Sequence, residues 1–473
     1  ICIILATTIT AFSQPDSLWS RRYQTEISAS TVLSDGGYAI TGILFDLDPD
    51  SVLLVLAKLD CMGEVVWENQ WQSIFNIRKV IETPDSGIAL AGYRRNNIWI
   101  NKYNSDGEEL YSWQFELEFS PEIRGLLPDG EGGYYAFGDA SISINARHDF
   151  VLFKISSEGE LEWQRIYHDR PFDQFGFSMI ANPEGGLMLV GRTLERNEGM
   201  EVLVIRTDED GEIIWRNHYG TELIDIPANE HGADIIATED GNFVITGVTI
   251  AHDDQNGHLN VLMLKIDADG EVLWLKTIDL DGEERARSIE KTMDGGFVLS
   301  GYRAEVGEQS GNPFIMKTDH RGNLIWSEVL EEISTNVRGT PYNLYAHEDR
   351  TFSLITRTNN GYYKGFLQKY GRDPHGVADG DNVFLPSWTG LESAYPNPFN
   401  GITTFVFTVG SPATVEIDIF NAIGRRQTGL VRRSYPAGQH NISWNAGGLP
   451  SGDYFARMTA GGAVSTKKVS LVK

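Results

Sequence analysis

Two short sequence patterns alternate along most of the chain, and this repetition restricts the possible folds more than any other feature. The first is a glycine turn that enters an apolar strand and ends in glycine, as in residues 294–301, DGGFVLSG. The second is a hairpin in which Lys, Asp, Gly and Trp follow at fixed spacing, as in residues 265–274, KIDADGEVLW. Together they describe a four-stranded antiparallel unit. Such units bury their apolar faces by stacking on one another, which predicts an all-β fold.

The copies of both patterns divide the chain into units of similar length. The glycine turn recurs at 35–42, 85–92, 131–138, 184–191, 240–247 and 294–301, with a degenerate copy at 348–357. The hairpin recurs at 58–67, 102–113, 154–163, 206–215, 265–274 and 317–326. Successive hairpin Trp residues lie 46 to 59 residues apart, which is the length of one four-stranded sheet with its connections.

The residues within each unit explain its strands and turns. Residues 261–264, VLML, are apolar on both faces, as expected of a strand buried between two sheets. In the hairpin turn, Asp bonds to its own backbone and Gly adopts the positive φ that the turn requires. The Trp that ends each hairpin is expected to anchor the outer strand on the neighbouring sheet.

The chain contains seven glycine turns but six hairpins that end in Trp, so the last unit lacks its outer strand. A matching strand lies near the N-terminus, because residues 18–23, LWSRRY, resemble 161–167 and 214–219. We expect this strand, with Trp19, to complete the last sheet and hide its edge. The prediction is a seven-bladed β-propeller over residues 17–371, closed by the N-terminal strand. An open solenoid is the alternative, and it gives no reason for the split unit.

The repeat resembles the propeller repeats of exported bacterial proteins over about three quarters of the chain. The hairpin is also similar to the repeat of pyrroloquinoline-quinone propellers, although that family normally has an additional Thr in the turn. These resemblances imply a fold and leave the function open.

The N-terminal residues have the composition of a targeting segment. Residues 1–11 are apolar but too few to span a bilayer, and Ala11 and Ser13 provide small residues at a cleavage site. We expect residues 1–13 to be a secretory signal peptide that lacks its start; a buried N-terminal strand is the alternative. No other segment is long and apolar enough to be transmembrane. Cys61 is the one cysteine after the signal, which excludes a disulfide framework and a cysteine zinc site.

The charge is strongly negative and unevenly distributed. The chain has a formal net charge of −27, whereas the part from Ala394 onward has eight basic and three acidic residues, a net +5. The remainder therefore carries −32. Such an acidic body repels the phosphates of nucleic acids and anionic membranes, so no nucleic-acid partner is expected. Solubility is the favoured interpretation of this charge, and cation storage or an acidic recognition face is the alternative.

A linker and a second domain follow the repeats. Residues 372–393 contain Asp, Gly and Pro without a periodic pattern, which is typical of a linker. Alternating strands and glycine turns over 394–473 predict a small immunoglobulin-like β-sandwich.

A set of motif residues in this segment occurs in a fixed order. The set comprises Tyr395, Pro396, Asn397, Pro398, Phe399, Asn400, Phe420, Asn421, Gly424, Pro436, Ala437, Gly438, Trp444, Gly448, Leu449, Ser451, Gly452, Tyr454, Lys467, Lys468, Val469, Leu471, Val472 and Lys473. With these residues the segment closely resembles the type A sorting domain that the type IX secretion system reads. The resemblance implies Sec export, the type IX machinery as a partner, passage through the outer membrane, and surface attachment or release, with any cleavage in the linker. An ordinary immunoglobulin-like module is the alternative.

Motifs of catalytic and cofactor sites are absent from the sequence. There is no His-Glu-x-x-His helix, Gly-x-Ser-x-Gly elbow, P-loop or dinucleotide fingerprint, so we predict no catalytic residue and no cofactor. His252, Asp253, Asp254 and His258 could bind a cation, but a solvated loop is favoured. Turns such as 267–270 resemble the start of a calcium loop and lack its distal ligands, so we predict no metal site.

One set of basic residues predicts a ligand site. Arg78, Arg124 and Arg287 each lie seven residues before the acidic residue that opens a glycine turn. Equivalent positions on the innermost strands of a propeller form one ring, so these arginines are candidates to bind a carboxylate, a phosphate or an acidic sugar. The alternative is that they pair with acids such as Glu82 or Glu122.

Three functions remain open at this point. The favoured one is an exported or cell-surface binding or adhesion module for a glycan, a peptide or a small anionic ligand, because propeller loops carry recognition. A secreted polysaccharide hydrolase or lyase at the channel mouth is the alternative, and it needs converging carboxylates. A quinone-dependent dehydrogenase ranks last, because the sequence has no signature of a cofactor pocket.

Overall fold

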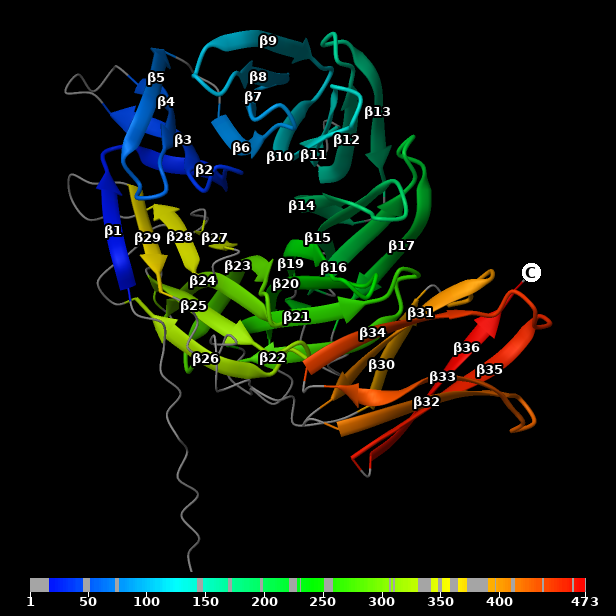
Figure 1. Cartoon of the computed structure of the whole chain (residues 1–473). Coiled ribbons are helices and arrows are strands. Elements are labelled where there is room, and N and C mark those ends of the chain that lie inside the picture. The colour runs from blue at the N-terminus through cyan, green and yellow to red at the C-terminus, as the bar shows by residue number, and fades with distance from the viewer. Residues whose placement is uncertain are drawn as a thin grey trace, which may run out of the picture. The chain divides into compact units, whose positions relative to one another are not determined.

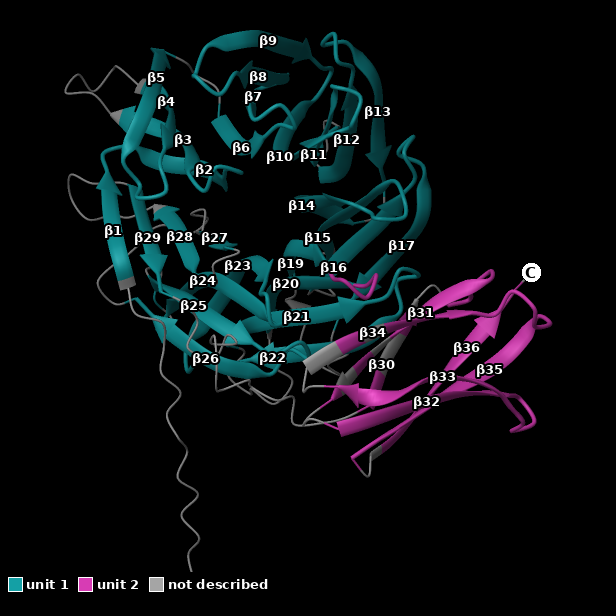
Figure 2. Ribbon diagram, viewed as in Figure 1, with its two compact units in different colours: residues 1–237, 243–373 teal, residues 238–242, 374–473 magenta. Residues whose placement is uncertain are grey.

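The computed structural model describes residues 17–45, 52–72, 76–142, 148–168, 172–195, 199–220, 228–229, 231–250, 258–305, 308, 311–330, 342–347, 351–357, 365–371, 390–395, 397–409, 413–435, 438–461 and 463–472. The secondary-structure elements in these ranges are 36 β-strands, with no helix, which confirms the all-β prediction (Figure 1). The chain divides into two compact units, Ile1–Ala237 with Phe243–Asp373 and Thr238–Asn242 with Pro374–Lys473 (Figure 2). The predicted signal peptide 1–13 and residues 372–389 of the predicted linker lie outside the described residues.

The first unit consists of antiparallel sheets that repeat one plan, in which four strands follow one another from the inside outward. The first strands are β2 (Glu26–Val32), β6 (Asn76–Glu82), β10 (Ser120–Pro128), β14 (Asp173–Ala181), β19 (His231–Ala237), β23 (Glu283–Lys291) and β27 (Tyr342–Ala346). The second strands are β3 (Tyr38–Phe45), β7 (Ile88–Arg94), β11 (Tyr134–Ser141), β15 (Leu187–Glu195), β20 (Phe243–Ile250), β24 (Phe297–Ala304) and β28 (Phe352–Arg357).

The outer half of each sheet contains the hairpin with the Trp. The third strands are β4 (Val52–Leu59), β8 (Asn97–Tyr103), β12 (His148–Ile155), β16 (Gly199–Thr207), β21 (Leu259–Ile266), β25 (Gly311–Thr318) and β29 (Gly365–Tyr370). The outermost strands are β5 (Val65–Gln72), β9 (Glu109–Glu116), β13 (Leu161–Tyr167), β17 (Ile213–Tyr219), β22 (Val272–Ile278), β26 (Leu324–Val329) and β1 (Ser17–Tyr23). The short β18 (Ala228–Asn229) pairs in parallel with β16.

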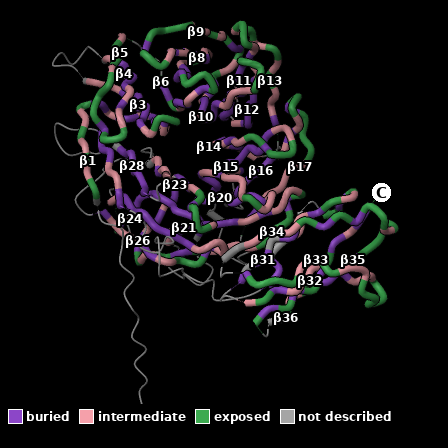
Figure 3. The backbone as a smooth tube through the Cα atoms, viewed as in Figure 1, coloured by how far each residue is buried: buried purple, intermediate pink, exposed green. Residues whose placement is uncertain are grey.

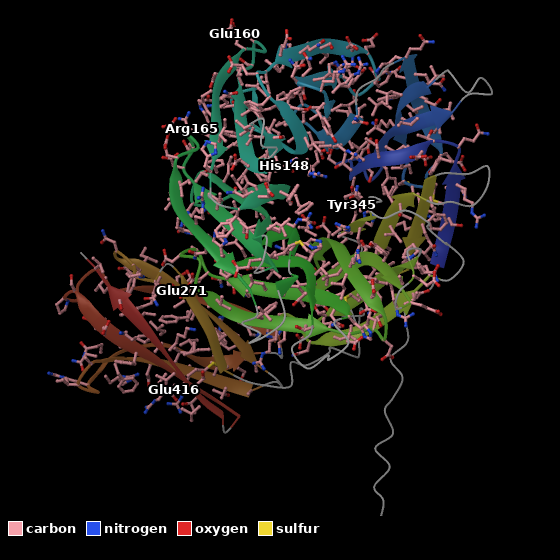
Figure 4. All side chains as sticks on the ribbon, turned by 180° about the vertical axis from the view of Figure 1, so that it is seen from behind. His148, Glu160, Arg165, Glu271, Tyr345 and Glu416 are labelled. Atoms are coloured by element: carbon pink, nitrogen blue, oxygen red, sulfur yellow. The ribbon has the colours of Figure 1, made fainter. Side chains whose placement is uncertain are left out.

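The innermost strands form a closed, propeller-like ring. Each contacts the next in the order β2, β6, β10, β14, β19, β23 and β27, and β27 returns to β2, as can be followed in Figure 1. At this last junction Tyr345 donates a hydrogen bond to the backbone oxygen of Ser30 at 2.7 Å, and Asn343 donates to the Ser30 hydroxyl at 2.7 Å. Figure 4 labels Tyr345 beside the centre of the ring.

The N-terminal strand completes the last sheet, as the sequence predicts. β1 pairs antiparallel with β29, so that Trp19 lies opposite Lys369 and Arg22 lies opposite Phe366. Trp19 packs on a core that includes Leu367 of the same sheet and Tyr38 of the following one. The split unit is therefore rejoined by residues from the two ends of the repeat region.

The glycine of each Trp hairpin packs against the Trp of the preceding outermost strand, which explains why both residues recur. A Cβ added to Gly107 would lie 2.7 Å from the Trp67 ring, and one added to Gly63 would lie 3.0 Å from Trp19. The pairs are Trp19 with Gly63, Trp67 with Gly107, Trp113 with Gly159, Trp163 with Gly211, Trp215 with Gly270 and Trp274 with Gly322. The repeat thus encodes a contact between neighbouring sheets, and Trp19 makes the same contact at the closure.

The Lys of the hairpin binds the acid of the glycine turn within its own sheet. Lys58 pairs with Asp35 at 2.8 Å and Lys102 with Asp85 at 2.6 Å. Since the two patterns lie far apart in sequence, this ion pair links the inner and outer halves of a sheet. Figure 3 shows that middle strands such as β12 are largely buried, whereas inner strands such as β10 combine buried and partly exposed residues and outer strands such as β9 include exposed ones.

The second unit consists of two sheets around one core. One contains β30 (Gly390–Tyr395), β31 (Ile402–Val409) and β34 (Gly438–Asn445), in that order. The other is ordered β33 (Arg426–Tyr435), β32 (Ala413–Asn421), β35 (Gly452–Ala460) and β36 (Ala463–Leu471). Buried Phe405, Trp444, Ile417 and Tyr454 join the two sheets. β30 begins at Gly390, so the last four residues of the predicted linker, 390–393, form a strand.

Candidate functional site

The three predicted ring arginines occupy the same irregularity in their strands. The register shifts between Ile77 and Lys79 in β6, so Arg78 is the extra residue, and Arg124 and Arg287 hold this place in β10 and β23. A β-bulge re-aims the side chain of its extra residue. The equivalent residues of the other bulged inner strands are Ser28, Phe177 and Ala233. Counting back from the glycine turn therefore locates the bulge in each of these strands.

Arg124 is held by two carboxylates. Its Nη2 lies 2.6 Å from Glu122 Oε2, and its Nε lies 3.4 Å from Asp139 Oδ1. Glu122 precedes Arg124 by two residues on β10 and so shares its face of the strand. The sequence-based alternative, pairing with Glu122, is correct for this arginine.

Asp139 is the buried centre of this arrangement, with a side chain only 1% exposed. Its second oxygen, Oδ2, lies 2.9 Å from Nδ1 of His148, which begins β12 and is labelled near the ring centre in Figure 4. The hydrogen bond to Asp139 raises the pKa of His148 above its ordinary value, although burial opposes this. Sequence reasoning did not select Asp139 or His148, because neither belongs to the repeated pattern.

Arg192 on β15 lies over two aromatic rings. Sequence reasoning did not select this residue either. Its guanidinium carbon is 4.7 Å from the centre of the Phe175 ring and 5.7 Å from that of Phe177. The Phe175 ring also stacks on the His148 ring, with the ring centres 4.8 Å apart. Among the described residues, Arg192 makes no ion pair, and its Nη1 donates a hydrogen bond to the Met200 sulfur at 3.3 Å.

The electrostatics around Arg192 are those of a crowded cationic site. Burial, followed by the charges of Arg287 and Arg124, lowers the pKa of Arg192, and the charge of Asp139 only partly opposes this shift. Burial and the charges of Arg287, Arg192 and Arg285 hold the pKa of His231 well below its ordinary value. The ring of Phe177 lies 5.5 Å from the Arg124 guanidinium and 5.7 Å from the His231 ring. Residues of three sheets thus converge at Phe177: Arg124 of β10, Arg192 of the same sheet as Phe177, and His231 of β19.

The remaining arginines lie at the edge of this group. Arg285 donates to the Tyr302 hydroxyl at 3.0 Å and lies 3.4 Å from Glu283, two residues earlier on the strand. Burial raises the pKa of Tyr93, and the neighbouring Arg78 and Arg124 oppose this shift. The charges of Arg124 and Arg287 likewise act on Arg192, so all three predicted arginines influence groups near the inner strands.

A second polar group lies further along the inner strands. Asp234 accepts hydrogen bonds from the Ser178 hydroxyl at 2.8 Å and from the Ile289 backbone at 3.2 Å, which links three consecutive sheets. Burial, together with the charge of Asp234, raises the pKa of Glu290 to about 8, and Lys79 opposes this shift. No set of three or more His, Cys, Asp or Glu side chains suited to a metal ion occurs in the described ranges. Of the loop residues considered for a cation, His252, Asp253 and Asp254 lie outside those ranges.

The motif residues of the second unit connect its beginning to its end. Phe399 is buried against Trp444 with ring centres 5.3 Å apart, and it bridges in parallel to Leu471. Asn397 accepts a hydrogen bond from the Ser470 backbone at 2.7 Å. Tyr454 donates to the Pro450 carbonyl at 2.8 Å.

The other motif residues lie on strands, turns and the surface. Tyr395 ends β30, Pro396 lies outside the described residues, and Pro398, Asn400 and Lys468 are exposed. Gly424 adopts a φ of +78° in the turn after β32, while Gly438 and Gly452 begin β34 and β35. Lys468 pairs with Asp453 at 3.0 Å.

The family comparison agrees with this geometry. Residues 393–472 match the model of the secretion system C-terminal sorting domain. The C-terminal segment is a type IX sorting domain. The protein is therefore exported to the cell surface or the extracellular space, as the sequence predicts. Within the part of the chain that the structure describes, no helix is long and apolar enough to cross a membrane.

Solved structures similar to this chain share little sequence with it. Virginiamycin B lyase from Staphylococcus aureus is 12% identical with a TM-score of 0.47, and the alignment covers 74% of this chain and 98% of that one. PorZ, a surface component of the type-IX secretion system of Porphyromonas gingivalis, is 12% identical with a TM-score of 0.42, covering 98% of this chain and 60% of that one. No curated protein sequence matches the chain.

Proposed function

We propose that the chain is an exported binding protein: a seven-bladed β-propeller over residues 17–371 whose immunoglobulin-like sorting domain at 394–473 delivers it to the cell surface. A signal peptide at 1–13 starts its export, and the segment 372–393 links the two domains. The closed order of inner strands and the pairing of β1 with β29 support the propeller. The two sheets around one core support the immunoglobulin-like assignment.

The observation that carries the binding function is the environment of Arg192. A cation withdrawn from water normally has a carboxylate partner, because desolvation of an uncompensated charge is costly. Arg192 is stacked on Phe175 and Phe177 without such a partner among the described residues, and further arginines lower its pKa. An anionic group from a ligand would supply the missing charge. Perturbed groups of this kind concentrate at functional sites.

The ligand class follows from the donors. Guanidinium groups bind carboxylate, phosphate and sulfate oxygens through paired hydrogen bonds. The ligand is therefore an acidic glycan, a peptide carboxylate or a small anion bound near Arg124, Arg192 and Arg287. We propose no nucleic-acid partner, because the ligand is bound by a local cluster of arginines whereas the chain as a whole carries −27 and offers no extended basic surface to a duplex.

An array of glycans and peptides tests this proposal with the full chain. The wild type should bind probes that carry carboxylate or sulfate groups and ignore their neutral counterparts. Arg192→Gln should weaken binding about tenfold or more, because it removes a charge-assisted contact. Arg165→Gln is the matched control, since Arg165 lies on the outer strand β13 and pairs with Glu212 at 3.0 Å. Equal binding by the Arg192 variant, or a preference for neutral probes, would contradict the proposal.

A polysaccharide hydrolase or lyase is the alternative function, and one observation favours it. Glu290, with a pKa of about 8, could remain protonated near neutral pH and act as a general acid, and Asp234 supplies a nearby carboxyl group. Turnover of the bound glycans, measured on the same array, separates the two functions. Release of products by the wild type and its loss in Glu290→Gln would establish the enzyme.

A further inference from the structure

The beginning and the end of the sorting domain are joined by backbone hydrogen bonds. The Phe399 amide donates to the Ser470 carbonyl at 2.9 Å, and the Val472 amide donates to the Phe399 carbonyl at 2.9 Å. Phe399 thus forms an isolated parallel bridge with Leu471 at the end of β36. Phe399 fixes this connection, because its side chain is 2% exposed and lies in the core of the domain.

Asn397 extends the connection with its side chain. Its Oδ1 accepts a hydrogen bond from the Ser470 amide at 2.7 Å, and its Nδ2 lies 3.4 Å from the Lys468 carbonyl. The side-chain amide therefore satisfies a donor and an acceptor of β36, as the backbone of a neighbouring strand would. Asn397 is exposed and packs little against the domain, so it stabilises this connection mainly through the two hydrogen bonds.

The opposite side of the same residues is held by β35. The Ser470 hydroxyl donates to Asp453 at 2.7 Å, and the Lys468 ammonium lies 3.0 Å from the same carboxylate. Residues 468–472 are therefore held by contacts on both edges of the strand, although they are the last residues that the structure describes. Terminal strands fray unless contacts of this kind hold them.

We propose that Asn397 is a positioning residue of the sorting signal, which joins the two ends of the domain so that the terminal strand meets the secretion machinery in an ordered form. The motif at the start of the domain and the strand at its end then act as one recognition element. The inference rests on the sorting domain alone and is independent of the ligand proposed for the propeller. The competing possibility is that the machinery contacts the Asn397 side chain directly.

Two measurements on the full chain separate these possibilities: the secreted fraction in a type IX-competent host, and hydrogen exchange of the β36 amides in the purified protein. Asn397→Ala should raise the exchange rate at Ser470 on the order of tenfold, since two hydrogen bonds are lost. It should also lower the secreted fraction. Asn445→Ala is the matched control, because Asn445 is exposed, lies outside the motif set and accepts a hydrogen bond from the Gly447 amide at 2.9 Å instead of from β36, so it should leave both values unchanged.

Asn397→Asp provides a graded variant. Its carboxylate can still accept from the Ser470 amide but cannot donate to the Lys468 carbonyl, so exchange and secretion should both fall between wild type and the Ala variant. The proposal is overturned if secretion fails while β36 exchange stays at the wild-type rate, because the side chain is then read directly. It is equally overturned if the strand loosens and secretion is unaffected.

Discussion

At the scale of single residues, the repeat is a set of contacts between neighbouring sheets. The glycine of each hairpin turn has two roles, because it adopts a positive φ and leaves space for the preceding Trp. Gly107 shows both: its φ is +85°, and Trp67 covers it while donating to the Ser105 carbonyl at 2.9 Å. The two roles can be separated experimentally, because Gly130 has the same φ of +85° and no atom within 4 Å of an added Cβ.

We predict that Gly107→Ala destabilises the propeller more than Gly130→Ala. Both variants force a side chain into the left-handed region, at about 1–2 kcal/mol. Gly107→Ala also displaces the Trp67 ring, which adds about 1–3 kcal/mol of overpacking. Denaturant unfolding of the two variants measures the difference. Equal losses would mean that the Trp contact contributes nothing to stability.

His148 makes the candidate site sensitive to pH. Its folded-state pKa is raised above the ordinary value of 6.5, first by the hydrogen bond to Asp139 and then by the charges of Asp139, Glu122 and Asp173. A raised pKa means that the stabilisation is fully present below about pH 6.5 and disappears as the pH rises through the folded-state value. The positive charge of the site falls over the same interval.

We therefore predict that stability and affinity for an anionic probe both decrease as the pH rises above about 6.5. His148→Gln should flatten both profiles over this interval, because it removes the titrating group and keeps a polar side chain. Unfolding and binding isotherms at a series of pH values measure these slopes. Parallel profiles for wild type and variant would assign the pH dependence to other groups.

At the scale of strands and sheets, the closure depends on β1. Trp19 is partly buried on the last sheet and packs against the hairpin glycine Gly63 of the first one. We predict that Trp19→Ala lowers the free energy of unfolding by about 1–3 kcal/mol and speeds hydrogen exchange in β29. Leu18→Ala on the same strand is the control, because Leu18 is 56% exposed. Unchanged exchange in β29 after the Trp19 substitution would show that the closure does not protect this strand.

The sequence predicts these elements because their signals are local and repeated. Turn glycines, hairpin Trp residues and the odd strand near the N-terminus define the sheets and the pairing of β1 with β29, which the register confirms. The count that selected Arg78, Arg124 and Arg287 identifies the bulge in six of the seven inner strands, all except β27. It also selects Phe177, whose aromatic side chain was the available clue to the centre of the site.

The rest of the site depends on contacts that no sequence period encodes. Arg192 lies on a second strand, and its role depends on Phe175 and Phe177 of the neighbouring strand β14. Asp139 and His148 meet because β11 and β12 are paired, with Asp139 near the end of one strand and His148 at the start of the other. The sequence could therefore predict a ring of positions, whereas the chemistry at its centre required the structure.

At the scale of the whole molecule, the two parts of the chain that differ in charge also have separate hydrophobic cores. The sorting segment from Ala394 onward carries +5 and the rest of the chain −32. Buried Phe405 and Trp444 belong to one hydrophobic cluster, formed by residues 391–471, and the other clusters draw their members from the sheets of the first unit. Each unit therefore has its own apolar core, which is the physical requirement for separate folding.

We predict that calorimetry of the full chain shows two unfolding transitions that respond to different substitutions. Trp19→Ala should lower the midpoint of the propeller by a few degrees and leave the sorting domain unchanged. Asn397→Ala should do the reverse, because substitutions in units with separate apolar cores are expected to act additively. The double variant should then show both shifts at their single-variant sizes. A single cooperative transition, moved by either substitution, would mean that the two units fold as one and that the terminal strand is held by more than its own domain.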